Sequence, residues 1–254
     1  MSVVLDLSVP AGGRVRTAWR PAVGEVKGWV WVQHGFSRRA RNMAGVAELL
    51  SAHGYVTVAP DIATLRPWRS MHDATWLTSV AATMARAVEV GLIEGRGIPV
   101  GGPWLGVGHS AGAAIVAHAA MVLRATHRSD ALPRTVDVAG LALLDPVDSV
   151  GGLFARALPT LDGLPLEAQT CRPSSCNRQG ILGDELARSG RLVAAYPNLN
   201  HGDPERIPRR LDVGDVPAPS RAIAAVCGAP GSPNDVLAMA TGLLASVERC
   251  RVGE

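Results

Sequence analysis

Gly108-His109-Ser110-Ala111-Gly112 is a G-x-S-x-G pentapeptide near the middle of the chain. It follows the apolar run Trp104-Leu105-Gly106-Val107 and precedes small residues with helical periodicity, Ala113-Ala114-Ile115-Val116-Ala117. This order predicts a strand, a tight turn and a helix, with glycines where Cβ atoms would collide in the turn. Such a turn lifts the Ser110 hydroxyl clear of the sheet and aims the Ala111 N–H at a developing oxyanion.

The same stretch also fits a dinucleotide-binding turn, because Gly106, Gly108 and Ala111 give the spacing G-x-G-x-x-A after a strand. That motif requires an acidic residue about 20 positions further on, at the end of the next strand. Asp130 has this spacing but lies in a polar segment, His127-Arg128-Ser129-Asp130, and not at a strand end. The remaining candidate residues of the chain favour a nucleophilic serine.

The composition is typical of a globular protein. The chain has 254 residues, 47% of them hydrophobic, which is enough for a full core in a single domain over residues 1–254. The net charge is only +3 and the arginines are scattered, so no nucleic-acid partner is expected. No apolar run reaches the ~18 residues of a membrane span. The N-terminus lacks a signal-peptide pattern, so we expect a cytoplasmic protein, or a secreted one if a signal peptide has been removed.

The four cysteines are too few for a disulfide framework and too scattered for a zinc site, so no metal is expected. In the cytoplasm we expect all of them to be free thiols. Cys171 and Cys176 are close enough in sequence to form a disulfide if the protein were exported.

Strand and helix patterns alternate along the chain, which predicts an α/β fold with a mostly parallel, eight-stranded sheet and helices on both faces. The expected strands are an N-terminal hairpin over 3–9 and 14–20, then 28–33, 55–59, 103–107, 138–144, 164–170 and 191–196. The expected helices are 43–53, 72–90, 111–128 and 234–250. The polar, proline-rich segment 202–219 is expected to be a surface loop. Functional groups in such sheets lie just beyond the carboxyl ends of the strands.

A serine nucleophile needs an acid and a base further along the chain, in the order Ser, Asp or Glu, His. Asp145 ends the strand that follows the elbow and is the expected acid of a catalytic triad. Asp148 is the alternative acid, and either carboxylate could instead begin a turn or cap a helix.

His201 is the expected base, because it lies in the loop after the last strand. The alternative for His201 is a surface histidine without a partner. His109 precedes the nucleophile, so its side chain should face away from the Ser110 hydroxyl. The other histidines lie on or beside predicted helices.

The loop after the third strand, His34-Gly35-Phe36, is expected to complete an oxyanion hole. Gly35 allows the backbone to approach the substrate closely. We expect the N–H groups of Phe36 and Ala111 to be the two donors, with His34 supporting the loop.

With these residues in place, the chain resembles the α/β-hydrolase superfamily, and within it the chlorophyllase-like and related bacterial carboxylesterases. The segments that carry the resemblance are Val32-Gln33-His34-Gly35-Phe36, His53-Gly54-Tyr55-Val56-Thr57-Val58-Ala59-Pro60, the pentapeptide at Ser110, Leu144-Asp145-Pro146-Val147, Ser175-Cys176-Asn177 and His201-Gly202-Asp203 with the later Cys227. The resemblance covers most of residues 28–250. It implies hydrolysis of carboxylic esters without a metal or organic cofactor. Chlorophyllases carry arginine and glycine after the serine, where this chain has Ala111-Gly112, so the ester stays open.

The predicted function is that of a serine hydrolase that cleaves a small-molecule ester through an acyl-enzyme. An acyltransferase with the same triad, or a non-catalytic small-molecule-binding protein of this fold, are the alternatives. The segment 151–163 is too short for a lid domain, so we expect an open cleft with a short cap or none. Trp68 and Phe154 are candidates for its apolar wall. The sequence leaves the oligomeric state open.

Overall fold

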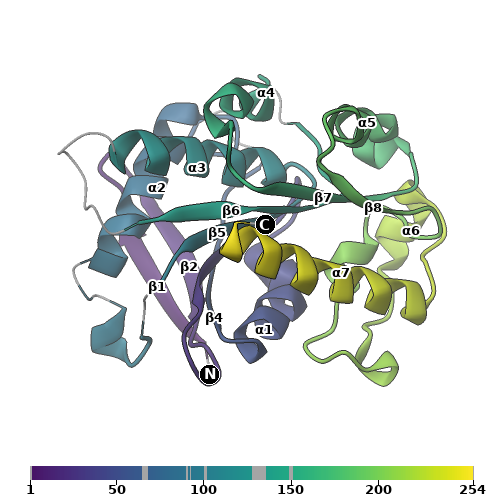
Figure 1. Cartoon of the computed structure of the whole chain (residues 1–254), viewed down its shortest axis with the longest axis horizontal. Coiled ribbons are helices and arrows are strands. Elements are labelled where there is room, and N and C mark those ends of the chain that lie inside the picture. Colours follow the sequence, from purple (N-terminus) through teal and green to yellow (C-terminus); the bar gives the residue numbers. More distant parts are fainter. Residues whose placement is uncertain are drawn as a thin grey trace.

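The centre of the protein is an eight-stranded sheet with the strand order β1-β2-β4-β3-β5-β6-β7-β8 (Figure 1). The computed structural model describes residues 2–64, 68–89, 91, 93–99, 102–127, 136–148 and 151–253. The strands are β1 (Val3–Ser8), β2 (Arg14–Arg20), β3 (Gly28–Gln33), β4 (Tyr55–Pro60), β5 (Trp104–His109), β6 (Val138–Leu144), β7 (Leu166–Cys171) and β8 (Leu192–Tyr196).

The sheet is mixed, because β2 pairs antiparallel with both β1 and β4, while the pairings from β4 to β8 are parallel. The mostly parallel sheet expected from the sequence is therefore confirmed. Strands β3, β4 and β5 are buried along their whole length. Strands covered by helices on both faces carry continuous apolar runs, which explains why these three are the clearest strand patterns in the sequence.

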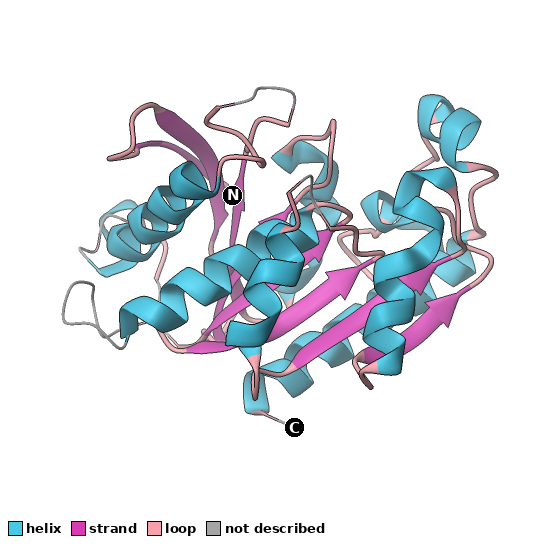
Figure 2. Cartoon of the chain, turned by 90° about the horizontal axis from the view of Figure 1, so that it is seen from above, coloured by secondary structure: helices cyan, strands magenta, loops and turns pink. Residues whose placement is uncertain are grey.

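Helices cover both faces of the sheet, and each face has its own buried core. On one face lie α2 (Ala74–Glu89), α3 (Gly112–His127), α4 (Leu153–Ala157) and α5 (Ile181–Arg188). Figure 2 shows this face from above, with helices lying across the strands. The opposite face is covered by α1 (Ala44–Ala52) and α7 (Pro233–Val252), and α6 (Arg221–Cys227) precedes α7. Within the described part of the chain, no helix has the length and apolarity needed to cross a bilayer.

The cysteines differ from the sequence-based expectation. Cys176 and Cys227 form a disulfide across a sequence separation of 51 residues, whereas Cys171 and Cys250 are buried free thiols. The expectation of four free thiols is therefore wrong for one pair, and so is the alternative bond between Cys171 and Cys176. The physical reason is tertiary, since the turn after β7 packs against α6 and brings two distant residues together.

We expect the double substitution Cys176→Ser and Cys227→Ser to lower the free energy of unfolding by about 2–4 kcal/mol. The bond closes a long loop and so reduces the conformational entropy of the unfolded chain. Urea unfolding with and without a reductant measures this effect. Reductant should shift the midpoint of the native protein and leave that of the double variant unchanged. An unshifted midpoint for the native protein would contradict the bond.

Candidate active site

Ser110 lies at the tip of a sharp turn between β5 and α3. Its backbone is left-handed, with φ of 56°, a conformation that non-glycine residues rarely adopt. A Cβ at Gly112 would lie 2.5 Å from the Gln33 carbonyl oxygen, so only glycine fits the close approach of helix to strand. The Ser110 N–H donates to the Leu144 carbonyl oxygen at 3.1 Å. Neighbouring backbone therefore fixes the position of the Ser110 hydroxyl.

Ser110, His201 and Asp145 form a continuous hydrogen-bonded chain. His201 Nε2 lies 2.8 Å from Ser110 Oγ, and His201 Nδ1 lies 2.5 Å from Asp145 Oδ2. All three residues are buried. Because a carboxylate oxygen only accepts, Nδ1 carries the proton and Nε2 presents its lone pair to the hydroxyl. The arrangement is able to remove a proton from Ser110 and to stabilise the imidazolium that forms.

The carboxylate of Asp145 accepts three further hydrogen bonds from two donor groups. The Cys171 N–H donates to Oδ1 at 3.0 Å, and Asn177 Nδ2 donates to Oδ1 and Oδ2 at 3.2 and 3.1 Å. These bonds stabilise the charged form of a buried carboxylate. The sequence pointed to Asn177 only as part of the segment Ser175-Cys176-Asn177 and assigned it no role, since only the fold brings the turn after β7 to the end of β6.

Asp148, the alternative acid, has a different role in the structure. Its carboxylate oxygens accept the backbone N–H groups of Phe154 at 2.8 Å and Ala155 at 3.2 Å. It therefore satisfies donors at the start of α4, and the structure brings Asp145 to His201 instead.

His109 supports the backbone of the histidine loop. Its Nε2 donates to the His201 carbonyl oxygen at 2.8 Å, and the two rings lie 5.0 Å apart between centroids. Burial, together with the nearby His201, lowers the pKa of His109 to about 3, so its ring is neutral at physiological pH. It was expected to face away from the Ser110 hydroxyl, but its contact with the loop of His201 could not be foreseen from the sequence.

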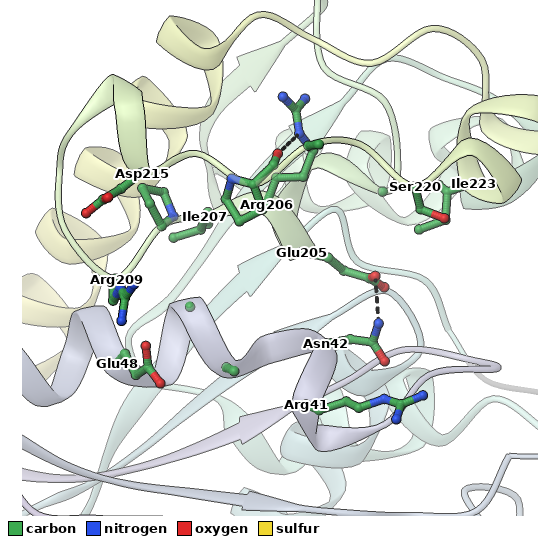
Figure 3. A pocket seen from close by; sticks show the side chains of 16 residues that line it. Arg41, Asn42, Glu48, Glu205, Arg206, Ile207, Arg209, Asp215, Ser220 and Ile223 are labelled. Atoms are coloured by element: carbon green, nitrogen blue, oxygen red, sulfur yellow. Dashed lines mark hydrogen bonds between the residues drawn. The ribbon is translucent and has the colours of Figure 1, made fainter. Parts of the chain in front are cut away.

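Glu205 lies beside His109, and its hydrogen bonds join the histidine loop to the segment before α1. Its carboxylate accepts from Arg38 Nε at 2.7 Å and from Asn42 Nδ2 at 3.3 Å, and it lies 3.9 Å from His109 Nδ1. Burial raises the pKa of Glu205. Figure 3 shows Glu205 and Asn42 bonded beside a pocket of about 430 Å³ between α1 and the segment after His201.

A buried ion pair holds the start of the segment that was expected to be a surface loop. Asp203 and Arg206 pair at 2.6 Å, and both side chains are buried. Asp203 Oδ2 also accepts the N–H groups of Asn200 at 2.7 Å and Gly231 at 2.8 Å. The expectation of a surface loop is therefore wrong for its first residues, because these bonds satisfy polar groups that flank His201 inside the protein.

The loop after β3 lies directly against Ser110. A Cβ at Gly35 would lie 2.6 Å from the Ser110 Cβ, so only glycine fits there. His34 Nδ1 donates to the Gly35 carbonyl oxygen at 2.9 Å, and His34 Nε2 accepts the Ile62 N–H at 3.2 Å. Burial lowers the pKa of His34, which favours the neutral ring that both bonds require. Its position fits the loop-supporting role expected from the sequence.

Two backbone N–H groups of the cleft have no hydrogen-bond partner among the described residues. Neither the Phe36 N–H nor the Ala111 N–H makes a hydrogen bond to any described residue. Both residues line the same cleft as Ser110. Unpaired donors beside a serine hydroxyl are suited to stabilising an oxyanion that forms there.

The cleft above Ser110 has a volume of about 660 Å³. It is lined by Phe36, Met71, His72, Ser110, Ala111, Val147, Asp148, Gly151, Gly152, Cys176 and Arg178. Phe154 is only 1% exposed, in the core below α4, so its expected place in the wall is wrong. Trp68 is 63% exposed but is not among the residues that line this cleft. The aromatic wall is Phe36, which is 48% exposed.

The fold is that of α/β-hydrolases, as comparison with solved structures shows. The esterase domain of a Rhodothermus marinus protein aligns over 99% of both chains, with a TM-score of 0.55 and 11% identity. Dienelactone hydrolase from Anabaena variabilis aligns over 98% of this chain and 96% of its own, with a TM-score of 0.55 and 18% identity. The thioesterase domain from the curacin biosynthetic pathway covers 96% and 99%, with a TM-score of 0.52 and 14% identity.

Other solved structures align less well, and the comparisons with family models and curated proteins found no match. The chain spans 50% of the length of a thermostable carboxyl esterase from Bacillus coagulans, with 64% of this chain covered, 19% identity and a TM-score of 0.38. No protein-family model matches the sequence, and no curated protein matches it. The comparisons therefore establish the fold, and the chemistry has to be argued from the site itself.

Proposed function

We propose that this protein is a serine hydrolase that cleaves carboxylic esters through an acyl-enzyme, with Ser110 as nucleophile, His201 as base and Asp145 as acid. The observation that carries the proposal is the buried chain of hydrogen bonds from Ser110 Oγ through the imidazole to the carboxylate. The esterase and thioesterase domains that share the fold support it.

Acylation begins when His201 Nε2 takes the Ser110 proton and Oγ attacks the ester carbonyl carbon. The carbonyl oxygen becomes an oxyanion, which accepts hydrogen bonds from the unpartnered N–H groups of Phe36 and Ala111. The resulting imidazolium is stabilised by Asp145. It then protonates the oxygen of the leaving alcohol as the ester C–O bond breaks, and Ser110 keeps the acyl group.

Deacylation repeats these steps with water. His201 Nε2 takes a proton from water, and the hydroxide oxygen attacks the acyl carbon in the same oxyanion site. His201 then returns its proton to Ser110 Oγ, the acyl C–O bond breaks, and a carboxylic acid leaves. His201 relays every proton in this scheme, between Ser110, the leaving alcohol and water.

We place the activity in the chlorophyllase-like and related bacterial carboxylesterase group. The support is the set of motifs around His34, Ser110, Asp145 and His201, together with Asn177, which binds the acid. The open cleft of about 660 Å³ suits a small ester rather than a long lipid chain.

Hydrolysis of p-nitrophenyl esters of increasing acyl length tests the proposed function. We expect turnover of short acyl esters, with the free acid as the main product. Methanol added as an alternative acceptor should give methyl ester as a minor product. A methyl ester as the dominant product would identify an acyltransferase, and no turnover of any ester by folded protein would overturn the proposal.

We expect Gly35→Ala to lower kcat for these esters by about 10²- to 10³-fold, the effect of losing one oxyanion donor. The added Cβ would meet Ser110 at 2.6 Å and would displace the loop that carries the Phe36 N–H. Gly95→Ala is the matched control, because no atom lies within 4 Å of its added Cβ. Steady-state kinetics together with urea unfolding separates lost catalysis from lost stability. Native kcat in Gly35→Ala would contradict the assigned loop.

A further inference from the structure

One charged side chain of the cleft has no role in the mechanism above. Arg178 lines the cleft, and its guanidinium makes no hydrogen bond or ion pair with any described residue. Asp148, the other cleft-lining residue with a formal charge, is engaged by the backbone N–H groups at the start of α4. Among the described residues of the cleft, the guanidinium of Arg178 is therefore the charged group without a partner.

The backbone that carries Arg178 is fixed relative to the nucleophile. Cys176 is bonded to Cys227, and Asn177 binds the carboxylate of Asp145. Arg178 itself has a left-handed backbone with φ of 54°, within the turn Ser175–Gly180 that follows β7. A cation is thus anchored between a disulfide and the triad acid, at a constant place in the wall of the cleft.

Other features of the cleft indicate a substrate with a polar end. His72 also lines it, and its buried Nδ1 has no hydrogen-bond partner among the described residues. The walls near Ser110 are otherwise apolar, with Phe36, Met71 and Val147. Arg178 is exposed at the edge of this cleft, so its guanidinium is accessible to a bound substrate. Its planar fork matches the two oxygens of a carboxylate.

We propose that Arg178 binds a carboxylate carried by the substrate, so that the enzyme prefers anionic esters to neutral esters of the same length. The inference rests on the proposed function and adds the substrate class. Asp148 forms no ion pair with Arg178, because its carboxylate oxygens accept two backbone N–H groups at the start of α4, so the guanidinium donors stay available to the substrate. A charge-assisted hydrogen bond of this kind corresponds to a preference of about tenfold in kcat/KM.

The test compares kcat/KM for mono-p-nitrophenyl adipate and p-nitrophenyl hexanoate, which have equal chain lengths. A second pair of esters has the same acyl group and differs only in a carboxylate on the leaving phenol. Comparing the two pairs shows whether the preferred anion lies on the acyl side or on the alcohol side of the substrate. In the native protein we expect the anionic ester of one pair to be favoured about tenfold, less so at high salt. Arg178→Gln should remove the preference and Arg178→Glu should invert it.

Arg210→Gln is the matched control, because it removes the same charge from an exposed loop residue outside the cleft. It should leave the preference at the native value. A preference absent from the native protein in both pairs, or equal in Arg178→Gln and native protein, overturns the inference while the proposed function stands. Absence of hydrolysis of every ester by native protein overturns the proposed function and this inference with it.

Discussion

Substitution of Ser110 by alanine is expected to lower kcat for ester hydrolysis by roughly 10⁴- to 10⁶-fold. The change removes the only oxygen that His201 Nε2 contacts at 2.8 Å among the described residues, so no acyl-enzyme can form. Folding should be preserved, because the hydroxyl makes no other hydrogen bond to the described residues and alanine, like serine, can be held in this left-handed backbone. Single-turnover kinetics on p-nitrophenyl acetate measures the loss.

Ser8→Ala serves as the control for this variant, since Ser8 is an exposed residue at the end of β1. Its kcat should equal that of the native protein. The unfolding midpoint of Ser110→Ala should lie close to the native value. A residual activity of Ser110→Ala above about 1% of native, in protein free of contaminating esterases, would show that another group is the nucleophile.

Substitution of Asp145 by asparagine is expected to lower kcat by about 10³- to 10⁴-fold. A neutral amide no longer stabilises the imidazolium, and it can leave His201 in the wrong tautomer for removing the Ser110 proton. Asparagine accommodates the left-handed backbone at this position, where φ is 43°, so the turn should persist. Steady-state kinetics across pH, with circular dichroism as a check on folding, measures the effect.

Asp148→Asn is the informative comparison, because the sequence alone leaves both carboxylates open as the acid. Its amide oxygen can still accept one N–H at the start of α4, so the change should act mainly on stability. We expect its kcat to fall far less than that of Asp145→Asn. Equal losses in the two variants would contradict the assignment of Asp145.

The sequence predicted those parts of the fold that depend on local chemistry. The pentapeptide around Ser110 predicted the strand, turn and helix, because a Cβ at Gly108 would collide with Gly112 and Ala113 of the same turn. The buried strands β3, β4 and β5 were recognisable from their continuous apolar runs. The sequence also placed Ser110 and Asp145 directly after strands and His201 in the loop after the last strand, as the structure has them.

Other parts of the fold depend on partners that are distant in sequence. Asn177 lies 32 positions from Asp145, and His109 lies 92 positions from His201, so no spacing rule connects them. The disulfide of Cys176 and Cys227 likewise joins residues that are 51 positions apart, so it could not be predicted from local sequence. The short helices α4, α5 and α6 have too few turns for a clear periodicity. The sequence therefore predicted Phe154 to line the cleft, although its side chain packs from α4 into the core.

The supporting residues around His201 explain why the site can be ordered without a large lid. His109 holds the backbone of the histidine loop, and Asp203 with Arg206 closes the segment that follows it. These contacts come from β5 and from the loop after β8, which are rigidly placed by the sheet. A site built on strand ends keeps its geometry while the cleft stays open to small substrates.

The most direct test of the central claim is covalent labelling of the nucleophile by a fluorophosphonate, followed by mass spectrometry of the intact protein and its peptides. The account predicts a single adduct on Ser110, formed in step with the loss of esterase activity, and no adduct in Ser110→Ala. Folded native protein that stays unlabelled, or that carries the adduct on a different residue, would contradict it.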